Sequence, residues 1–451
     1  MMKPRQPRGR FPGLALPWSV ITLVLTGLAT ADDWPHWRGP ARNDTVRESS
    51  HFAGGEWLPR EPAWGRNFGV GCGSPIVVGG KLYVMGRDAT DRGGQRDNVY
   101  CVDAATGKDL WKASYDCPLY GRHSDGDKGL YAGPCSTPEF DEPTGYLYTL
   151  SIDGDLHGWD TRTEGRKVWG LNLYERYAVP MRPRVGRSGH RDYGYTSSPL
   201  VHGDMLIVEV GATDAKRAGG NLVGFDKRTG KQLWSSEAND PAGHNGGPVP
   251  ITVEGVPCVA VLNHAGLLVA RLDAGREGRT VARYPWVTSF ANNIASPTVH
   301  EDSVLITSGY NQQKICRLKI TLASVTKVWE NDLHSKVCSP IVYNGHVYWV
   351  WQSLYCLDWE TGKLRWQQRG QFSDPGSCIV TGDGRLIVWA GTGRLLLAET
   401  ADRAPREPKI LAQRDGLFRH DAWPHVVLAD GRLFCKDKQG NAKCFVLHGD
   451  R

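Results

Sequence analysis

The chain has 451 residues, of which 54 are Lys or Arg and 48 are Asp or Glu. Four basic and no acidic residues lie in residues 1–31, so the other 420 residues carry 50 basic against 48 acidic groups, a net charge of +2 that gives no support for nucleic acid as a partner. The 54 glycines, 27 prolines and 17 tryptophans are typical of many short strands and turns, and they argue against a mainly helical protein.

Residues 1–31 have the layout of a secretory signal peptide. A basic head precedes an apolar run from Leu14 to Leu28 and the small residues Ala29-Thr30-Ala31. This pattern predicts cleavage after Ala31 and export to the periplasm or cell envelope, and the alternative is an uncleaved anchor. No later apolar stretch approaches the length of a membrane span.

Residues 32–61 begin with Trp34-Pro35-His36-Trp37 and show little hydrophobic periodicity. They predict an N-terminal extended arm laid on the surface of the main body. Residues 62–451 are predicted to be one domain, because a single pattern repeats along this whole length.

A turn motif is the first element of that repeat. Its clearest copy is Asp103-Ala104-Ala105-Thr106-Gly107-Lys108, followed by Trp111. Asp and Thr side chains can bond back to the turn backbone, and glycine tolerates the positive φ of the reversal. The motif returns before Trp169, Trp234 and Trp366, while Trp329 stands alone and Ala282 replaces the tryptophan of one weak copy.

A short strand led by a small residue and proline is the second element. Eight copies, two of them degenerate, start at Ser74, Thr137, Ser198, Gly247, Ser296, Ser339, Ser377 and Trp423. Most copies lead through a two-residue turn into further apolar strands, and each repeat predicts a four-stranded antiparallel meander. Eight such meanders at this spacing predict an all-β fold, an eight-bladed β-propeller.

The ends of the chain predict how the ring closes. The eighth repeat stops after its third strand, and Trp64 precedes the first repeat at the distance that separates Trp329 from Pro340. An N-terminal strand at Trp64 is therefore expected to complete the last blade, which removes the exposed sheet edges.

The eleven cysteines predict packing positions rather than a disulfide framework. Cys101, Gly158, Gly224 and Cys356 each lie two residues before a turn aspartate, and Cys444 is placed similarly. The alternation of glycine and cysteine indicates that these positions require a small side chain. One bridge, between Cys435 and Cys444, would form if the last hairpin has the right register.

The Asp-x-x-Thr-Gly-Lys-x-x-Trp turn together with the Ser-Pro strands resembles the quinoprotein-type propeller repeat. That repeat is shared by the pyrroloquinoline quinone (PQQ)-dependent alcohol dehydrogenases and the outer-membrane assembly lipoprotein BamB. The resemblance covers residues 62–451 and implies eight blades with tryptophans docked between neighbours. It implies little about function, because the same ring serves enzymes and binding proteins.

The chain departs from both branches of the resemblance. The dehydrogenases have two adjacent cysteines against the quinone, and this sequence has no Cys-Cys pair and no Cys-x-x-Cys-His haem site. Their calcium ligands and catalytic aspartate match no position here. The lipid-bearing cysteine of BamB is also missing.

Ligand-binding candidates lie between each tryptophan strand and the next Ser-Pro strand, because these segments should converge on one mouth of the central channel. The candidates are His123, Arg184, Arg187, His190, Arg191, Tyr193, His244, Asn293, His334 and His420. The arginines and tyrosines could clamp a small anion, and the alternative is a solvated basic loop. Single histidines are more often packing residues, so no metal site is expected.

These patterns predict an exported, monomeric, non-catalytic binding or scaffold module without a cofactor. Its partner would be a protein or a small anionic ligand at the channel mouth. The alternative is a PQQ- and calcium-dependent dehydrogenase, which a pair of calcium-binding carboxylates at the mouth would favour.

Overall fold

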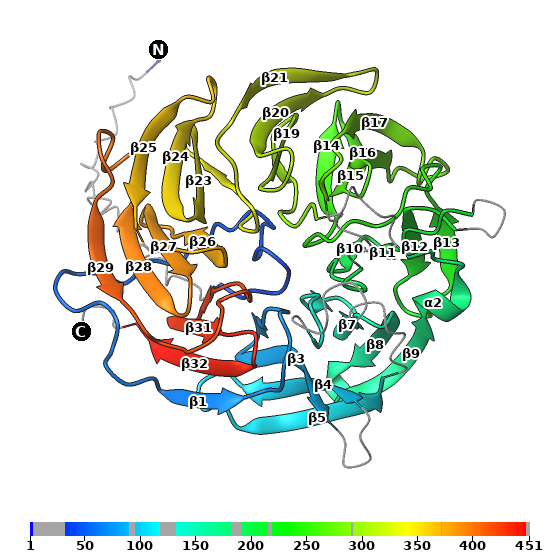
Figure 1. Ribbon diagram of the computed structural model, residues 1–451, viewed down its shortest axis with the longest axis horizontal. Coiled ribbons are helices and arrows are strands. Elements are labelled where there is room, and N and C mark those ends of the chain that lie inside the picture. The colour runs from blue at the N-terminus through cyan, green and yellow to red at the C-terminus, as the bar shows by residue number, and fades with distance from the viewer. Residues whose placement is uncertain are drawn as a thin grey trace. The chain divides into compact units, whose positions relative to one another are not determined.

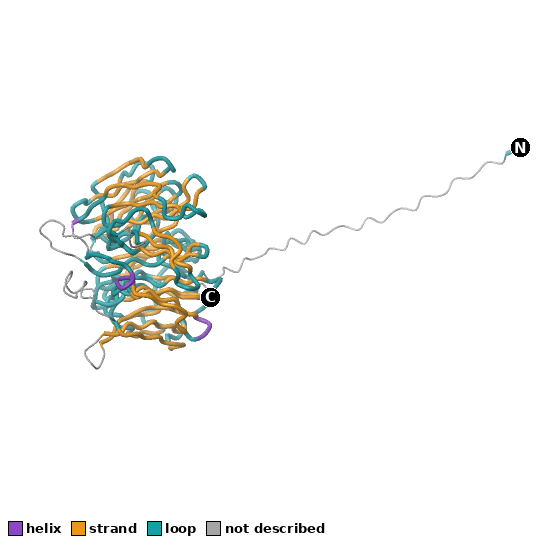
Figure 2. The backbone as a smooth tube through the Cα atoms, turned by 90° about the vertical axis from the view of Figure 1, so that its right-hand side faces the viewer, coloured by secondary structure: helices purple, strands orange, loops and turns teal. Residues whose placement is uncertain are grey.

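The computed structural model describes residues 1–2, 32–89, 95–117, 132–181, 192–214, 219–289, 292–370 and 372–447. All of its strands lie in the unit Ala31–Arg451. Within these described residues the strands form eight four-stranded antiparallel sheets. The sheets are arranged as the blades of a ring (Figure 1), and Figure 2 shows the ring from the side. The predicted eight-bladed propeller is confirmed.

Each blade runs from an inner strand at the channel to an outer strand at the circumference (Figure 1). Blades 1 to 4 are β2 (Ile76–Val78), β3 (Lys81–Ala89), β4 (Gln95–Asp103), β5 (Asp109–Asp116); β6 (Glu139–Asp141), β7 (Tyr146–Leu150), β8 (Asp155–Asp160), β9 (Arg166–Asn172); β10 (Leu200–His202), β11 (Met205–Glu209), β12 (Leu222–Asp226), β13 (Gln232–Ser235); and β14 (Val249–Val253), β15 (Val256–Leu262), β16 (Gly266–Arg271), β17 (Thr280–Pro285).

Blades 5 to 7 are β18 (Thr298–His300), β19 (Ser303–Ser308), β20 (Lys314–Ile320), β21 (Val325–Asn331); β22 (Ile341–Tyr343), β23 (His346–Trp351), β24 (Ser353–Asp358), β25 (Leu364–Arg369); and β26 (Gly376–Val380), β27 (Arg385–Ala390), β28 (Arg394–Glu399), β29 (Ile410–Arg414). Blade 8 joins β30 (Val427–Ala429), β31 (Arg432–Lys436) and β32 (Asn441–Val446) to β1 (Trp64–Asn67). The helices of the described residues are η1 (Thr161–Thr163) and α2 (Leu173–Arg176), and none of these residues forms a helix long and apolar enough to cross a bilayer.

The turn motif forms as predicted. The Asp103 carboxylate accepts hydrogen bonds from the backbone N–H of Thr106 (2.8 Å) and from its hydroxyl (2.7 Å), and Gly107 has a φ of +68°. The same bonds join Asp226 to Thr229 and Asp358 to Thr361. Side-chain oxygens thus satisfy the backbone of each sharp reversal.

Repeat tryptophans join several blades to the next, because Trp64, Trp111, Trp169 and Trp329 each lie against a turn glycine of the following blade. A Cβ on Gly107 would lie 2.7 Å from the Trp64 ring, and one on Gly165 would lie 2.5 Å from the Trp111 ring. The Trp64 indole also donates to the Ala104 carbonyl at 2.9 Å. These tryptophans lie between blades as expected. Trp111, Trp169, Trp234 and Trp329 are half-buried, whereas Trp366 is buried.

The last blade closes as predicted. In the register of β1 and β32, Trp64 lies opposite Cys444. The small-residue positions also behave as expected, because a Cβ on Gly158 or Gly224 would come within 2.7 Å or 2.2 Å of the facing tryptophan ring.

The bridge between Cys435 and Cys444 does not form. Cys444 pairs with Phe434, and Cys435 pairs with Lys443, one residue out of register. Since neighbouring residues of a strand point to opposite faces, the two thiols face apart. The described residues contain no disulfide bond.

The N-terminal arm is placed differently from the prediction. Residues 34–46 do not lie on the outside of the ring but fill its centre (dark blue in Figure 1). Trp34 pairs with Val77 of blade 1, and Thr45 pairs with Val380 of blade 7. The buried Arg38 guanidinium donates to the carbonyl of Pro340, ahead of blade 6, at 2.8 Å. The arm therefore binds inner strands on several sides of the channel.

Two charge clusters hold the arm in place. Arg38 pairs with Asp44 at 2.5 Å, and His425 of blade 8 approaches the same carboxylate at 3.2 Å. Arg42 forms a bidentate ion pair with the buried Glu139 of blade 2. Buried charges of this kind are tolerated only when they are paired and hydrogen-bonded. The arm is thus an internal plug. Its charged residues are of types that are ordinarily found on the surface.

Candidate ligand-binding site at the channel mouth

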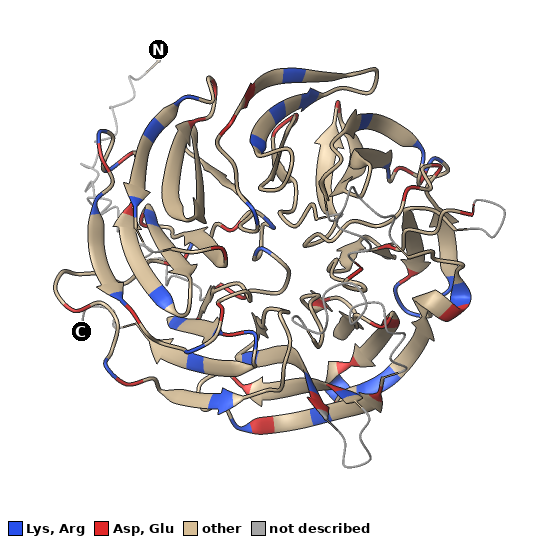
Figure 3. Cartoon of the chain, in the orientation of Figure 1, with Lys and Arg blue, Asp and Glu red and all other residues tan. Residues whose placement is uncertain are grey.

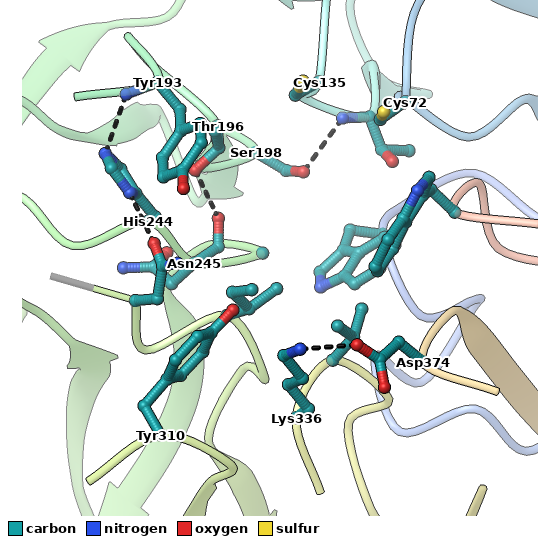
Figure 4. A pocket seen from close by; sticks show the side chains of 17 residues that line it. Cys72, Cys135, Tyr193, Thr196, Ser198, His244, Asn245, Tyr310, Lys336 and Asp374 are labelled. Carbon is teal, nitrogen blue, oxygen red and sulfur yellow. Dashed lines mark hydrogen bonds and ion pairs between the residues drawn. The ribbon is translucent and has the colours of Figure 1, made fainter. Parts of the chain in front are cut away.

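A cavity of about 200 Å³ lies where the segments leading into the eight inner strands meet. Every blade contributes to its wall: Cys72, Cys135, Tyr193, His244, Asn292, Lys336, Asp374 and Trp423 come from the segments before the inner strands of blades 1 to 8. Figure 4 shows these segments converging on one space. The predicted convergence of the connecting segments on one mouth is confirmed.

The arm supplies one wall of the cavity through Trp37. The Trp37 indole donates to the Ser296 hydroxyl at 2.9 Å and meets the His425 ring edge-on, with 5.5 Å between ring centroids. Trp423, Tyr193 and Tyr310 add three more aromatic rings to the lining. The cavity therefore offers mainly flat apolar faces, with a few polar groups among them.

An ion pair is the main charged feature of the lining. Lys336 Nζ lies 2.5 Å from Asp374 Oδ2 and 5.5 Å from the centroid of the Tyr310 ring. Burial alone would raise the pKa of Asp374, but hydrogen bonds from Lys336 and Trp351 hold this pKa below its ordinary value. The carboxylate is thus ionised at neutral pH and neutralises much of the charge that Lys336 brings to the cavity.

His244 lines the cavity but serves as a structural link. Its Nε2 accepts from the Tyr193 backbone N–H at 3.0 Å, and its Nδ1 lies 2.7 Å from the Asn292 side-chain oxygen. Because Nε2 accepts, these partners fix the neutral tautomer with the proton on Nδ1. Both ring nitrogens are occupied, so the ring cannot bind a metal without losing a contact.

The other predicted site residues are dispersed. Asn293 is fully buried and donates to the carbonyls of Asn263 and Trp286, so it is a packing residue. His334 packs on Trp351, and burial lowers its pKa. His420 is exposed. Neither histidine lines the cavity, and His123, Arg184, Arg187, His190 and Arg191 lie outside the described residues.

The lining residues that sequence reasoning missed include Trp37, Cys72, Cys135, Tyr310, Lys336, Asp374 and Trp423. Five of these seven lie within five residues before an inner strand, and this position is the signal that could have found them. Trp37 carries no comparable signal, because nothing in its neighbourhood repeats elsewhere in the chain.

The described part of the lining offers few ligands for the calcium that would accompany PQQ. Calcium requires six to eight oxygen ligands, usually including several carboxylates. Among the described lining residues Asp374 is the only carboxylate, and it is bonded to Lys336 and Trp351. In the same described part of the chain, no three His, Cys, Asp or Glu side chains are grouped to hold a metal ion.

Comparison with known proteins gives two groups of relatives. The chain is similar to the dehydrogenase subunit of the quinone alcohol dehydrogenase of Gluconobacter oxydans (strain 621H), with 32% identity over 165 residues. The corresponding subunit of Komagataeibacter europaeus is 30% identical over 164 residues. Each match covers 36% of this chain, and the chain spans only 18% and 19% of the length of these curated relatives.

Among solved structures, BamB from Moraxella catarrhalis matches with a TM-score of 0.58 at 11% identity, covering 86% of this chain and 99% of that one. The quinohemoprotein alcohol dehydrogenase of Comamonas testosteroni matches with a TM-score of 0.55 at 14% identity, covering 93% and 81%. At such identities these structures show the shared fold alone. Residues 95–368, more than half of the chain, match the family model described as outer membrane protein assembly factor BamB, and the chain belongs to that family of PQQ-like propellers.

Proposed function

We propose that this chain is an exported binding module, not an oxidoreductase, whose cavity takes a small organic molecule with an aromatic ring and an anionic group. The observation that carries this proposal is the plugged channel. Residues 34–46 fill the centre of the ring, and Trp37 becomes part of the cavity wall. What remains is a pocket of about 200 Å³, below the roughly 300–1,000 Å³ typical of pockets for drug-sized ligands.

The aromatic lining supports a flat ligand. Trp37, Trp423, Tyr193 and Tyr310 belong to four separate segments, so a planar ring in the cavity can contact several of them. Each favourable aromatic pair contributes about 0.5–1.5 kcal/mol beyond the area it buries.

The anionic group would be recognised by Lys336, the basic residue of the described lining. The present partner of Lys336, Asp374, would compete with a ligand carboxylate for the same ammonium group. The sequence before Tyr193 adds Arg184, Arg187 and Arg191, whose placement lies outside the described residues. Lys336 and this basic stretch together support an anionic rather than a cationic ligand.

A protein partner is the competing binding role, since the family is named for an assembly factor. The surface favours the small molecule. Each exposed large apolar residue of the described ring lies on or just beside an outer strand, in a different blade from the others; these residues are Leu110, Val168, Leu233, Val287, Val328, Leu364 and Val446. Basic and acidic residues are interspersed around the ring (Figure 3). Among the described residues, neither pattern makes the contiguous patch typical of a protein-docking surface.

The test uses phenylacetate and its neutral analogue phenylacetamide, followed by quenching of tryptophan fluorescence. We expect the acid to bind more tightly than the amide, and Lys336→Gln to remove the difference. Asp374→Asn should strengthen binding of the acid, because it releases Lys336 from its ion pair. Lys327→Gln, at an exposed position of β21, is the matched control. Equal affinity for acid and amide in the wild type would contradict an anion site.

The dehydrogenase alternative is tested on the same preparation. With PQQ, calcium and an electron-accepting dye, the proposal expects no alcohol-dependent dye reduction. Reduction that requires both the quinone and calcium would overturn the binding-module proposal in favour of the enzyme.

A further inference from the structure

Three of the eleven cysteines are only half-buried, and two of these three line the cavity. Cys72 lies in the segment before β2, and Cys135 lies in the segment before β6. Figure 4 shows both thiols on the same side of the cavity. The third, Cys117, follows β5 and does not line the cavity. A small reagent in the cavity would therefore meet Cys72 and Cys135 before the other cysteines.

The two segments that carry these cysteines are in backbone contact. The Gly73 N–H donates to the Pro134 carbonyl at 2.9 Å. A Cβ on Gly71 would lie 2.8 Å from the Pro134 oxygen, and a Cβ on Gly73 would lie 2.4 Å from the Ser136 oxygen. The glycines on both sides of Cys72 thus permit an approach that other residues would block. Backbones this close are a requirement for a disulfide, whose Cα atoms are about 4.4–6.8 Å apart.

A buried lysine lies behind Cys72. Lys436 is fully buried, and its Nζ donates to the carbonyls of Gly71 (2.5 Å) and Gly73 (3.1 Å), the residues that flank Cys72. Within the described residues no carboxylate forms an ion pair with it. Burial disfavours this ammonium group and lowers the pKa of Lys436 to about 8, so any negative charge close by stabilises it, as that of the neighbouring Asp437 does in part. The Cys72 thiolate is suited to supply that negative charge.

The electrostatics distinguish Cys72 from Cys117. A hydrogen bond from Cys135 lowers the pKa of Cys72, and the positive charges of Lys436 and Lys438 act in the same direction, against the effects of burial and of the negative charge of Asp421. Burial and the negative charge of Asp97 instead raise the pKa of Cys117. Since the thiolate is the reactive form of cysteine, Cys72 should be the more reactive of the two.

We propose that Cys72 and Cys135 are a reversible dithiol–disulfide pair that opens onto the cavity and exchanges with small-molecule disulfides. In the first step the Cys72 thiolate attacks one sulfur of the small disulfide, forms a mixed disulfide and releases a thiolate. In the second step the Cys135 thiol loses its proton and attacks the Cys72 sulfur, which releases the second thiolate. The protein loses two electrons and the small disulfide gains them. The new bond joins the segments that lead into blades 1 and 2.

The test treats the folded full-length protein with oxidised glutathione and identifies the products by peptide mass spectrometry under non-reducing conditions. We expect a Cys72–Cys135 disulfide in the wild type. Cys135→Ser should stop the reaction at glutathione-modified Cys72, and Cys72→Ser should prevent both products. Cys117→Ser is the matched control and should leave the exchange unchanged.

The role of Lys436 as a positioning residue is tested by the pH profile of Cys72 alkylation with iodoacetamide. Lys436→Gln should move the profile to higher pH, with a loss of on the order of tenfold in rate for each unit. Lys436→Arg, which keeps the charge, should restore part of the rate. An unshifted profile in a folded Lys436→Gln variant would show that Lys436 does not set the reactivity.

A second cysteine pair provides an internal control. The sulfurs of Cys338 and Cys378 are 3.6 Å apart, but both side chains are buried. They should resist exchange until the protein unfolds. The proposal is overturned if this pair reacts as fast as Cys72 and Cys135 in the native protein, or if Cys135→Ser fails to accumulate the mixed disulfide. The trapping result does not depend on the Lys436 variants.

Discussion

At the circumference of the ring, neighbouring blades meet through a recurring contact, in which a tryptophan lies on a turn glycine of the next blade. At the centre, each blade presents different residues to the arm and to the cavity. Repetition suits the circumference because the same kind of contact joins several pairs of neighbouring blades. The centre has one cavity and one arm to accommodate, so its residues differ from blade to blade. Fold specificity thus lies in the repeated positions, and function is expected in the unrepeated ones.

The largest effect is expected when both the central arm and the closing strand β1 are removed. A variant that begins at Gly71 lacks the arm and β1, which leaves the edge of β32 unpaired. We expect it to aggregate, because an exposed sheet edge pairs with other chains. A variant that begins at Ala63 keeps β1 and should remain monomeric with a lower melting temperature. Light scattering and thermal melts distinguish the two, and a monomeric Gly71 variant with unchanged melting would disprove closure by β1.

Trp389 tests whether repeated tryptophans matter most. It matches no repeat position, and the sequence therefore predicts a minor role. In the structure it is fully buried in β27, against Phe418. Trp389→Ala should lower the free energy of unfolding by about 4–5 kcal/mol, near the upper end for buried aromatic residues. Trp111→Ala, at a half-buried repeat position, should cost clearly less in denaturant unfolding. Equal losses would mean that burial does not rank these sites.

Glu139 tests the anchoring of the arm through pH. Burial alone would raise the pKa of Glu139, but Arg42 and His36 hold it at about 2, below the ordinary 4.5. A lowered pKa means stability that is complete above about pH 4.5 and is lost as the pH falls toward 2. Glu139→Gln should cost about 3 kcal/mol at pH 7, as expected for a broken buried pair, and clearly less at pH 3. The exposed Glu142→Gln is the control, and a pH-independent difference would argue against this ion pair.

The smallest effect is expected at a single repeated turn. Asp103→Ala removes two hydrogen bonds from Thr106 at a half-buried position. We expect a loss of about 0.5–1.5 kcal/mol in thermal unfolding, in the range of a typical net hydrogen bond. The exposed Lys108→Ala, in the same turn, should be neutral. A loss as large as that of Trp389→Ala would show that one turn controls the whole ring.

The sequence predicted the parts of the structure that repeat. The turn at Asp103 could be predicted because other copies of the motif have the same pattern. The closing strand at Trp64 could be predicted because the other repeats show which strand the last repeat lacks. The position of the arm could not be predicted in this way, because its sequence does not repeat. Arg38 and Asp44 have side chains that are ordinarily exposed, and only the tertiary structure brings them to His425 and Pro340.

The candidate site was predicted as a place rather than as a set of side chains. Tyr193 and His244 do line the cavity. However, the hydrogen bonds of His244 with Tyr193 and Asn292 show that His244 has a structural role. Its role depends on side-chain distances that no linear pattern encodes. The pairing of Cys72 with Cys135 is also invisible in the sequence, because it arises only when blades 1 and 2 meet at the mouth.

The position of the arm has a consequence for the kinetics of folding. Arg38 bonds to Pro340 across 302 residues, and Trp37 bonds to Ser296 across 259. Contacts between such distant residues make a fold slow to form, because long loops must close before the contacts are gained. A chain emerging N-terminus first can bind its arm to blade 1 early, but the contacts with blades 5 to 8 must wait. The ligand cavity is therefore completed in the same late step that brings β1 and β32 together.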